Sequence, residues 1–75
     1  MMSIQEFLPH FATMLEADPA DIQLDTEYQE LDEWSSVTAM TLIAFAKTQF
    51  GKTITGQAIR RAKTVEELFS LFTTT

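Results

Sequence analysis

Residues 36–50 constrain the fold more than any other segment, because they predict a helix that is apolar on most sides. The apolar residues of this segment are Val37, Met40, Leu42, Ile43, Ala44, Phe45, Ala46 and Phe50. A helix of this kind is usually surrounded by other elements of a domain. Gly51 follows it and tolerates the left-handed conformation in which helices commonly end. We therefore expect residues 36–50 to form the central helix of a small bundle.

The size and composition of the chain leave helix packing as the main source of stability. It has 75 residues, no cysteine and one histidine. A disulfide or a thiolate metal site is therefore impossible, and we expect no metal. A domain of this size buries only about 60% of the surface of its unfolded chain. The 45% hydrophobic content is enough for one compact core, so we predict a single all-α domain over residues 1–75.

Capping boxes predict where two other helices begin. Ser3 and Glu6 have the spacing at which each side chain accepts a hydrogen bond from the backbone N–H of the other. We expect this helix to run from Ser3 to about Glu16 and to be kinked at Pro9, because proline removes one helical hydrogen bond.

Thr64 and Glu67 repeat this spacing and predict the start of the last helix. A short helix is expected over residues 55–62, and the tail over residues 73–75 is expected to fray. The prediction is thus a small bundle of three main helices plus one short helix.

A long first loop, residues 17–35, separates the first two predicted helices. Its apolar residues have neither helical nor strand spacing, and we expect them to hold the loop against the helices; they are Ile22, Leu24, Tyr28, Leu31 and Trp34. A loop of this length in so small a domain is uncommon and often functional.

Charge is divided unevenly along the chain, whose formal net charge is −6. Residues 1–33 contain nine acidic residues and no lysine or arginine, whereas all five basic residues lie between Lys47 and Lys63. An acidic surface repels phosphate backbones, which excludes nucleic acid as a partner. It steers the domain toward basic patches on other proteins, or it only keeps the domain soluble.

Other sequence features indicate a soluble, cytoplasmic monomer. No run approaches the roughly 20 apolar residues that span a bilayer, so we expect no membrane insertion. The first residues lack the basic and apolar segments of a secretory signal.

No combination of residues predicts a catalytic site, and we expect the protein not to be an enzyme. His10 is the only imidazole and is predicted to be an exposed surface residue. The acidic residues of the first loop lack the ligand spacing and glycine of a calcium loop. Gly51 and Gly56 do not form a phosphate-binding loop. The six phenylalanines lie at helical spacing and are expected in the core.

Ser35 and Ser36 stand where the central helix begins. A serine at this position either caps the helix, which is worth about 1 kcal/mol relative to alanine, or presents its hydroxyl as an attachment point. A helix start also favours an attached phosphate, through its free N–H groups and the positive end of the helix dipole.

With these features, the chain resembles the acyl carrier protein family over essentially its whole length. The Asp-Ser-Leu motif of that family aligns with the segment Trp34-Ser35-Ser36-Val37, so that Ser36 takes the place of the modified serine. Three further segments are similar to the family: Leu42-Ile43-Ala44-Phe45, Phe50-Gly51 followed by Ile54, and Ala62-Lys63-Thr64-Val65-Glu66-Glu67-Leu68.

This resemblance implies a carrier. A separate phosphopantetheinyl transferase would attach 4′-phosphopantetheine from coenzyme A to Ser36. The arm would then carry acyl groups as thioesters to acyl-transferring and ketosynthase-type enzymes, in fatty-acid, polyketide or related specialised biosynthesis. Two alternatives stay open, namely an aminoacyl or peptidyl carrier and an unmodified protein-interaction module in which both serines only cap the helix.

The chain departs from the family at two places. Ser35 replaces the aspartate before the modified serine, which keeps a helix cap but loses its charge and makes Ser35 an alternative acceptor. The family's acids along the second helix are absent, and Thr38, Thr41 and Thr48 are expected at exposed positions beside Lys47. Partner contact would then depend on the first loop and on Val37, Met40 and Thr41. A cleft for an acyl chain is expected at Phe45, Ile54, Ala58 and Ile59, which are otherwise ordinary core residues.

Overall fold

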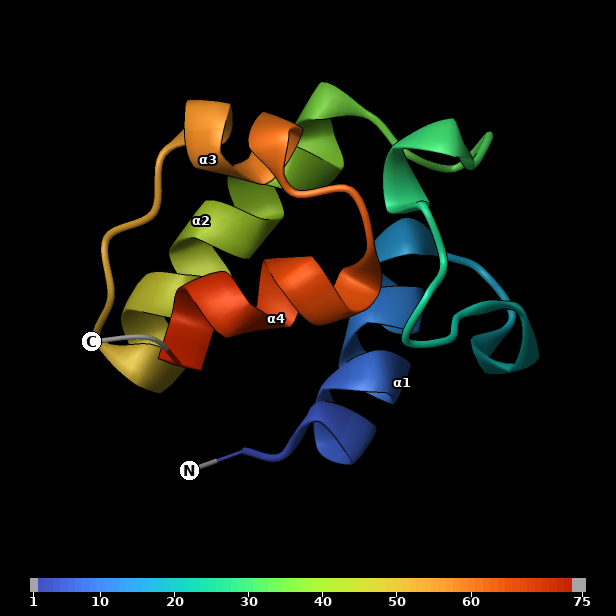
Figure 1. The fold of residues 1–75 in the computed structure, drawn as a ribbon, viewed down its shortest axis with the longest axis horizontal. Coiled ribbons are helices and arrows are strands. Elements are labelled where there is room, and N and C mark those ends of the chain that lie inside the picture. The colour runs from blue at the N-terminus through green and yellow to red at the C-terminus, as the bar shows by residue number, and fades with distance from the viewer. Residues whose placement is uncertain (1, 74–75) are drawn as a thin grey trace.

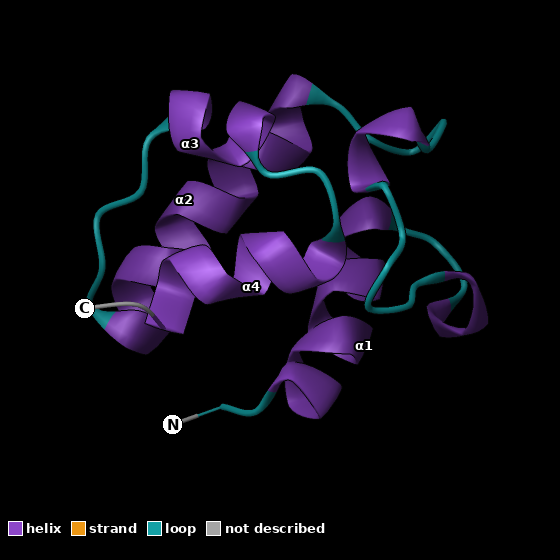
Figure 2. Cartoon of the chain, in the orientation of Figure 1, coloured by secondary structure: helices purple, strands orange, loops and turns teal. Residues whose placement is uncertain are grey.

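Helices form the whole framework of the chain, which a computed structural model describes over residues 2–73. In order they are α1 (Ile4–Leu15), η1 (Pro19–Asp21), η2 (Tyr28–Glu30), α2 (Ser36–Phe50), α3 (Gly56–Arg61) and α4 (Val65–Thr73), where η denotes a single 3-10 turn. Figure 1 shows α4 lying across α2 and α1, and Figure 2 shows no strand in the described range. The predicted small all-α bundle is therefore confirmed.

The first helix begins as its sequence predicts. Ser3 Oγ accepts a hydrogen bond from the N–H of Glu6 at 3.3 Å, and Glu6 Oε1 accepts one from the N–H of Ser3 at 2.9 Å. Pro9 lies inside α1, which continues through it to Leu15. The Pro9 carbonyl accepts a hydrogen bond from Thr13 Oγ1 at 3.0 Å.

The last helix also begins with the predicted capping box. Thr64 Oγ1 accepts a hydrogen bond from the N–H of Glu67 at 3.2 Å, and Glu67 Oε1 accepts one in return at 3.3 Å. Glu67 Oε1 accepts a second hydrogen bond from the N–H of Lys63 at 2.7 Å. The bonds from Lys63 and Thr64 hold the pKa of Glu67 below its ordinary value. Thr73 is the last residue of α4, while residues 74–75 of the predicted tail lie outside the described residues.

The central and short helices follow the predicted positions closely. Gly51 ends α2 in the left-handed conformation, with φ at 66°, and its N–H donates to the carbonyl of Lys47. The short helix α3 is one residue shorter at each end than predicted. Thr55 is its cap, accepting from the N–H of Ala58 at 3.1 Å, and Ala62 has already left the helical conformation.

Aromatic rings from three helices form the centre of the core. Phe7 of α1 is fully buried, and its ring centroid lies 5.5 Å from that of Phe11 and 5.3 Å from those of Phe69 and Phe72. Ring pairs at these distances add to the stabilisation that burial provides. Phe11 and Phe72 are also buried, while Phe45, Phe50 and Phe69 are partly buried against the core. The expected core role of all six phenylalanines is confirmed.

The first loop is held to the bundle partly as the sequence predicts. Ile22 and Tyr28 are buried, and Leu31 and Trp34 are partly buried against the core. Leu24 differs, because 37% of its surface is exposed. The backbone carbonyl of Leu24, and not its side chain, holds the loop to the bundle.

The backbone carbonyls of the first loop accept from the N–H groups at the start of α4. Glu66 donates to the Leu24 carbonyl at 2.9 Å, and Val65 donates to the Thr26 carbonyl at 3.0 Å. These two N–H groups belong to the first turn of a helix, where no intrahelical acceptor exists. The loop therefore completes the start of α4.

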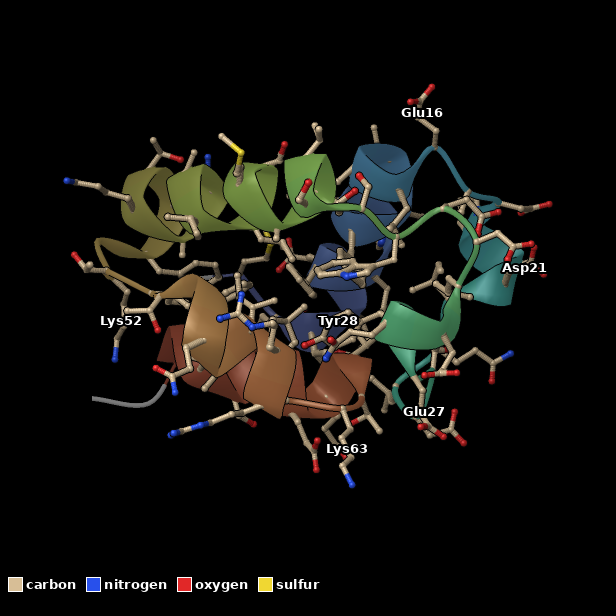
Figure 3. All side chains as sticks on the ribbon, turned by 90° about the horizontal axis from the view of Figure 1, so that it is seen from above. Glu16, Asp21, Glu27, Tyr28, Lys52 and Lys63 are labelled. Atoms are coloured by element: carbon tan, nitrogen blue, oxygen red, sulfur yellow. The ribbon has the colours of Figure 1, made fainter. Side chains whose placement is uncertain are left out.

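Tyr28 is the largest fully buried side chain of the loop, and Figure 3 shows it in the middle of the molecule. Its ring packs edge-on against Phe11 at 5.7 Å and Trp34 at 4.9 Å. Its hydroxyl donates toward the carbonyls of Ile59 and Ala62 at the end of α3. The pKa of Tyr28 is raised from its ordinary value of 10.0 to about 12, mainly because the hydroxyl is buried.

This pKa predicts a loss of stability at alkaline pH. The pKa of Tyr28 is higher in the folded protein than in the unfolded chain. The contribution of the neutral Tyr28 hydroxyl to the free energy of unfolding is therefore complete below pH 10 and is lost as the pH rises toward about 12. A shift of this size corresponds to about 3 kcal/mol. We compare the free energy of unfolding of the wild type with that of Tyr28→Phe by urea denaturation. We expect the advantage of the wild type to fall by about 3 kcal/mol between pH 10 and about pH 12. A difference independent of pH would contradict the prediction.

Candidate functional site

Ser35 acts as the cap of α2. Its backbone is extended, with φ at −152°, and its Oγ accepts a hydrogen bond from the N–H of Thr38 at 3.4 Å. The Thr38 hydroxyl lies 3.4 Å from the same oxygen, and the Ser35 carbonyl accepts from the N–H of Ala39 at 3.2 Å. The capping role predicted for Ser35 is confirmed, and its hydroxyl is directed to the helix.

Ser36 is the first residue of α2 and has an exposed side chain. Within residues 2–73, its hydroxyl has no hydrogen-bond partner in the protein. Among these residues the backbone N–H groups of Ser36 and Val37 are also without acceptors, as is usual in a first turn. The two adjacent serines therefore differ in environment, because only Ser36 has a hydroxyl that no protein group engages.

The chain that leads into α2 is anchored to the core one residue before the cap. Trp34 packs edge-on against Tyr28, with 4.9 Å between ring centroids. Its N–H donates to the carbonyl of Leu31 at 3.1 Å, which closes a turn. The chain therefore enters α2 from a residue that packs against the core, and Ser36 lies exposed two positions later.

Beside Ser36, α2 exposes two large apolar side chains. Val37 and Met40 are each 68% exposed. Thr41 is exposed as well, and its hydroxyl donates to the Val37 carbonyl at 3.0 Å. Residues spaced by three and four positions share one face of a helix, so Val37, Met40 and Thr41 form one patch, called the α2 patch below. These are the residues that the sequence predicts for partner contact.

The expectation of three exposed threonines on α2 is wrong for one of them. Thr38 is buried, with 4% of its surface exposed, whereas Thr41 and Thr48 are exposed as predicted. Thr38 turns toward the interior because it lies one helical turn before Leu42, which is fully buried on the same face of the helix. In this buried position, both the N–H and the hydroxyl of Thr38 lie within hydrogen-bond distance of Ser35 Oγ.

The four residues predicted for an acyl cleft all contribute to the core or pack against it. Ile59 is fully buried, Ile54 is 6% exposed, and Phe45 and Ala58 are partly buried. They come from α2, α3 and the connection between these helices, which are in contact. The cleft stays a prediction. A surface hollow of about 210 Å³ lies elsewhere, lined by Glu27, Gln29, Glu30 and Lys63.

Acidic side chains gather around the first loop. Figure 3 shows Glu16, Asp21 and Glu27 on the side of the first loop, with Lys63 near Glu27 and Lys52 at the far end. The acidic residues Asp32 and Glu33 are exposed just before the start of α2. Ser36 and the α2 patch therefore lie next to an acidic loop.

Other groups of the described residues form no recognisable reactive site. His10 is exposed as predicted, and its ring centroid lies 5.9 Å from that of Phe45. Over residues 2–73 no three histidine, aspartate or glutamate side chains gather in a way that could bind a metal. None of the helices in this range is long and apolar enough to cross a bilayer.

Sequence reasoning missed the polar role of two adjacent loop residues. Tyr28 was predicted only as an apolar anchor, and Gln29 was not considered. The Gln29 amide donates to the carbonyls of Ala62 at 2.8 Å and Arg60 at 3.0 Å. The available signal was the tyrosine itself, since a buried tyrosine hydroxyl usually needs a hydrogen-bond partner.

Comparisons of this chain with models of protein families, with curated proteins and with solved structures find no match.

The different environments of the two serines predict different effects on stability. Ser35→Ala removes the cap of α2 and should lower the free energy of unfolding by about 1 kcal/mol. Ser36→Ala changes an exposed hydroxyl without a protein partner and should stay within about 0.5 kcal/mol of the wild type. Urea denaturation followed by circular dichroism measures both. A larger loss in Ser36→Ala than in Ser35→Ala would contradict this assignment.

Proposed function

We propose that this protein is an acyl carrier protein in which Ser36 carries a 4′-phosphopantetheine arm. A separate phosphopantetheinyl transferase forms the bond between Ser36 Oγ and the phosphate of the arm, while the nucleotide part of coenzyme A leaves and the hydroxyl proton is removed. The arm carries acyl intermediates as thioesters for fatty-acid, polyketide or related specialised biosynthesis. The protein is a substrate and carrier for enzymes of these pathways and does no catalysis itself.

One observation carries this proposal most strongly, namely the exposed and unengaged hydroxyl of Ser36 at the first position of α2. It coincides with the residue that the resemblance to carrier proteins selects. Ser35 is the weaker acceptor, because its oxygen already accepts from the N–H of Thr38 and caps the helix. Modification of Ser35 would compete with that cap.

The surroundings of Ser36 fit the phosphate of such an arm. Within the described residues, the N–H groups of Ser36 and Val37 lack acceptors. They stand at the positive end of the α2 dipole, where a negative charge is favoured. The first turn of α2 contains no acidic residue that would repel the phosphate. When attached, the arm supplies a thiol, which this cysteine-free chain lacks.

A second candidate is a protein-interaction module of carrier-like fold that is never modified. The exposure of Val37 and Met40 favours it, since an interface needs apolar side chains in reach of a partner whether or not an arm is attached. An aminoacyl or peptidyl carrier differs from the main proposal only in its cargo. In all three cases we propose a cytoplasmic monomer that contacts partners through the α2 patch.

The main proposal predicts a covalent gain of mass. The purified protein is incubated with coenzyme A and a transferase of broad specificity, and its intact mass is measured. We expect the wild type and Ser35→Ala to gain one phosphopantetheine, and Ser36→Ala to gain none. Circular dichroism shows whether each variant is folded.

Two outcomes would overturn the main proposal. If a folded wild type gains nothing with several transferases, the interaction module is favoured. If Ser35→Ala but not Ser36→Ala abolishes the gain, the arm belongs on Ser35. Loading of the modified protein with acyl or aminoacyl groups then distinguishes the two kinds of carrier.

The α2 patch is predicted to govern recognition by the transferase. Met40→Glu places a charge in the centre of an apolar contact and should lower kcat/KM for modification by about tenfold, the effect of a moderate interface residue. Thr48→Glu is a matched control, because it adds the same charge to an exposed position two turns further along α2. Equal effects of both variants would show that added charge alone, and not contact with the patch, is responsible.

A further inference from the structure

The end of α3 is completed by side chains from the first loop. The last carbonyls of any helix lack intrahelical donors. In α3 the carbonyl of Ala58 accepts from the N–H of Ala62, which leaves those of Ile59, Arg60 and Arg61, and that of Ala62 beyond them, in need of donors. The carbonyls of Ile59, Arg60 and Ala62 accept hydrogen bonds from residues about thirty positions earlier in the sequence.

Two side chains of the first loop supply the donors at this junction. Tyr28 supplies one O–H and the Gln29 amide supplies two N–H groups. The Tyr28 hydroxyl lies between the carbonyls of Ile59 and Ala62, the latter at 2.9 Å. Gln29 Nε2 lies 3.3 Å from the Ile59 carbonyl, 3.0 Å from that of Arg60 and 2.8 Å from that of Ala62. Three hydrogens thus serve three carbonyl oxygens.

Without these contacts, α3 has little to keep it helical. It has six residues, whereas isolated helices shorter than about 12 residues are marginal in water. Only Ile59 of α3 is fully buried. The segments on either side, residues 51–55 and 62–64, are not α-helical. The conformation of α3 therefore depends on its Thr55 cap, on Ile59 and on its polar contacts with the loop.

We propose that the side chains of Tyr28 and Gln29 form a latch that holds α3 closed, and that α3 opens as a unit separate from α1, α2 and α4 when this latch is released. Opening exposes the apolar side chain of Ile59 and the inward side of its neighbour Ile54, both of which are buried in the closed state. The inference does not depend on the proposed carrier function, because it rests on the hydrogen bonds of the latch alone.

The latch is connected to the start of α2. The Tyr28 ring packs against Trp34, which lies directly before the capping Ser35. The ring whose hydroxyl bonds the end of α3 is therefore in contact with the residue two positions before Ser36.

Amide hydrogen exchange of the whole protein, read residue by residue by NMR, tests the latch. Gln29→Glu keeps the shape of the side chain but replaces both donors by acceptors. Gln23→Glu is the matched control, since it makes the same change in the same loop at an exposed side chain. The informative amides are those of Ile59 and Ala62, which are bonded within α3 or its cap, to the carbonyls of Thr55 and Ala58.

We expect Gln29→Glu to speed exchange of the Ile59 and Ala62 amides at least about tenfold relative to Gln23→Glu, with a much smaller change in the buried part of α1. Local opening of this kind changes protection in one segment only. Tyr28→Phe, which removes a single hydroxyl, is the second variant and should act in the same direction. The latch is wrong if both variants accelerate all helices equally, or if neither accelerates α3 beyond the control.

Discussion

The hydrogen bonds between the first loop and the α3–α4 junction are the constraint on which the rest of the structure depends. Tyr28 and Gln29 donate to carbonyls at the end of α3, and the carbonyls of Leu24 and Thr26 accept from the first turn of α4. Helices of six and nine residues leave a large share of their backbone groups without partners inside the helix. The loop supplies those partners, which explains how a bundle with such short helices is completed.

The same loop determines where the candidate site lies. A continuous series of ring contacts runs from Phe11 through Tyr28 to Trp34, which directly precedes Ser35. Because Trp34 is fixed against the core, the chain turns into α2 with Ser35 as its cap and Ser36 at the surface. The proposed attachment at Ser36 fits this arrangement, because its side chain is exposed and, within residues 2–73, no protein group engages its hydroxyl. The exposed acidic residues Asp32 and Glu33 precede Ser36 in the chain, and the apolar α2 patch follows it.

Local patterns explain which parts of the fold could be predicted from the sequence. The capping boxes at Ser3 and Thr64 and the helix end at Gly51 depend on residues within one helical turn, and all three were predicted correctly. The latch depends on contacts between residues about thirty positions apart, and no local pattern indicates them.

Errors on individual residues have the same origin. The burial of Thr38 depends on how α2 is rotated against its neighbours, and the exposure of Leu24 depends on a bond between its carbonyl and α4. Both are properties of the assembled bundle. At the candidate site, the resemblance selects Ser36 as the acceptor and leaves Ser35 as an alternative. The structure adds that the Ser35 oxygen accepts a hydrogen bond from the N–H of Thr38, whereas within residues 2–73 the Ser36 hydroxyl has no partner.

The proposed acceptor role of Ser36 is tested most directly on the wild-type chain, by fragmenting the peptide around residues 34–41 after exposure to coenzyme A and a phosphopantetheinyl transferase. Fragment masses that separate Ser35 from Ser36 locate the added group without any substitution. We predict that every modified fragment carries the arm on Ser36. An arm on Ser35, or a folded protein that remains unmodified, would contradict the assignment of Ser36 as the acceptor.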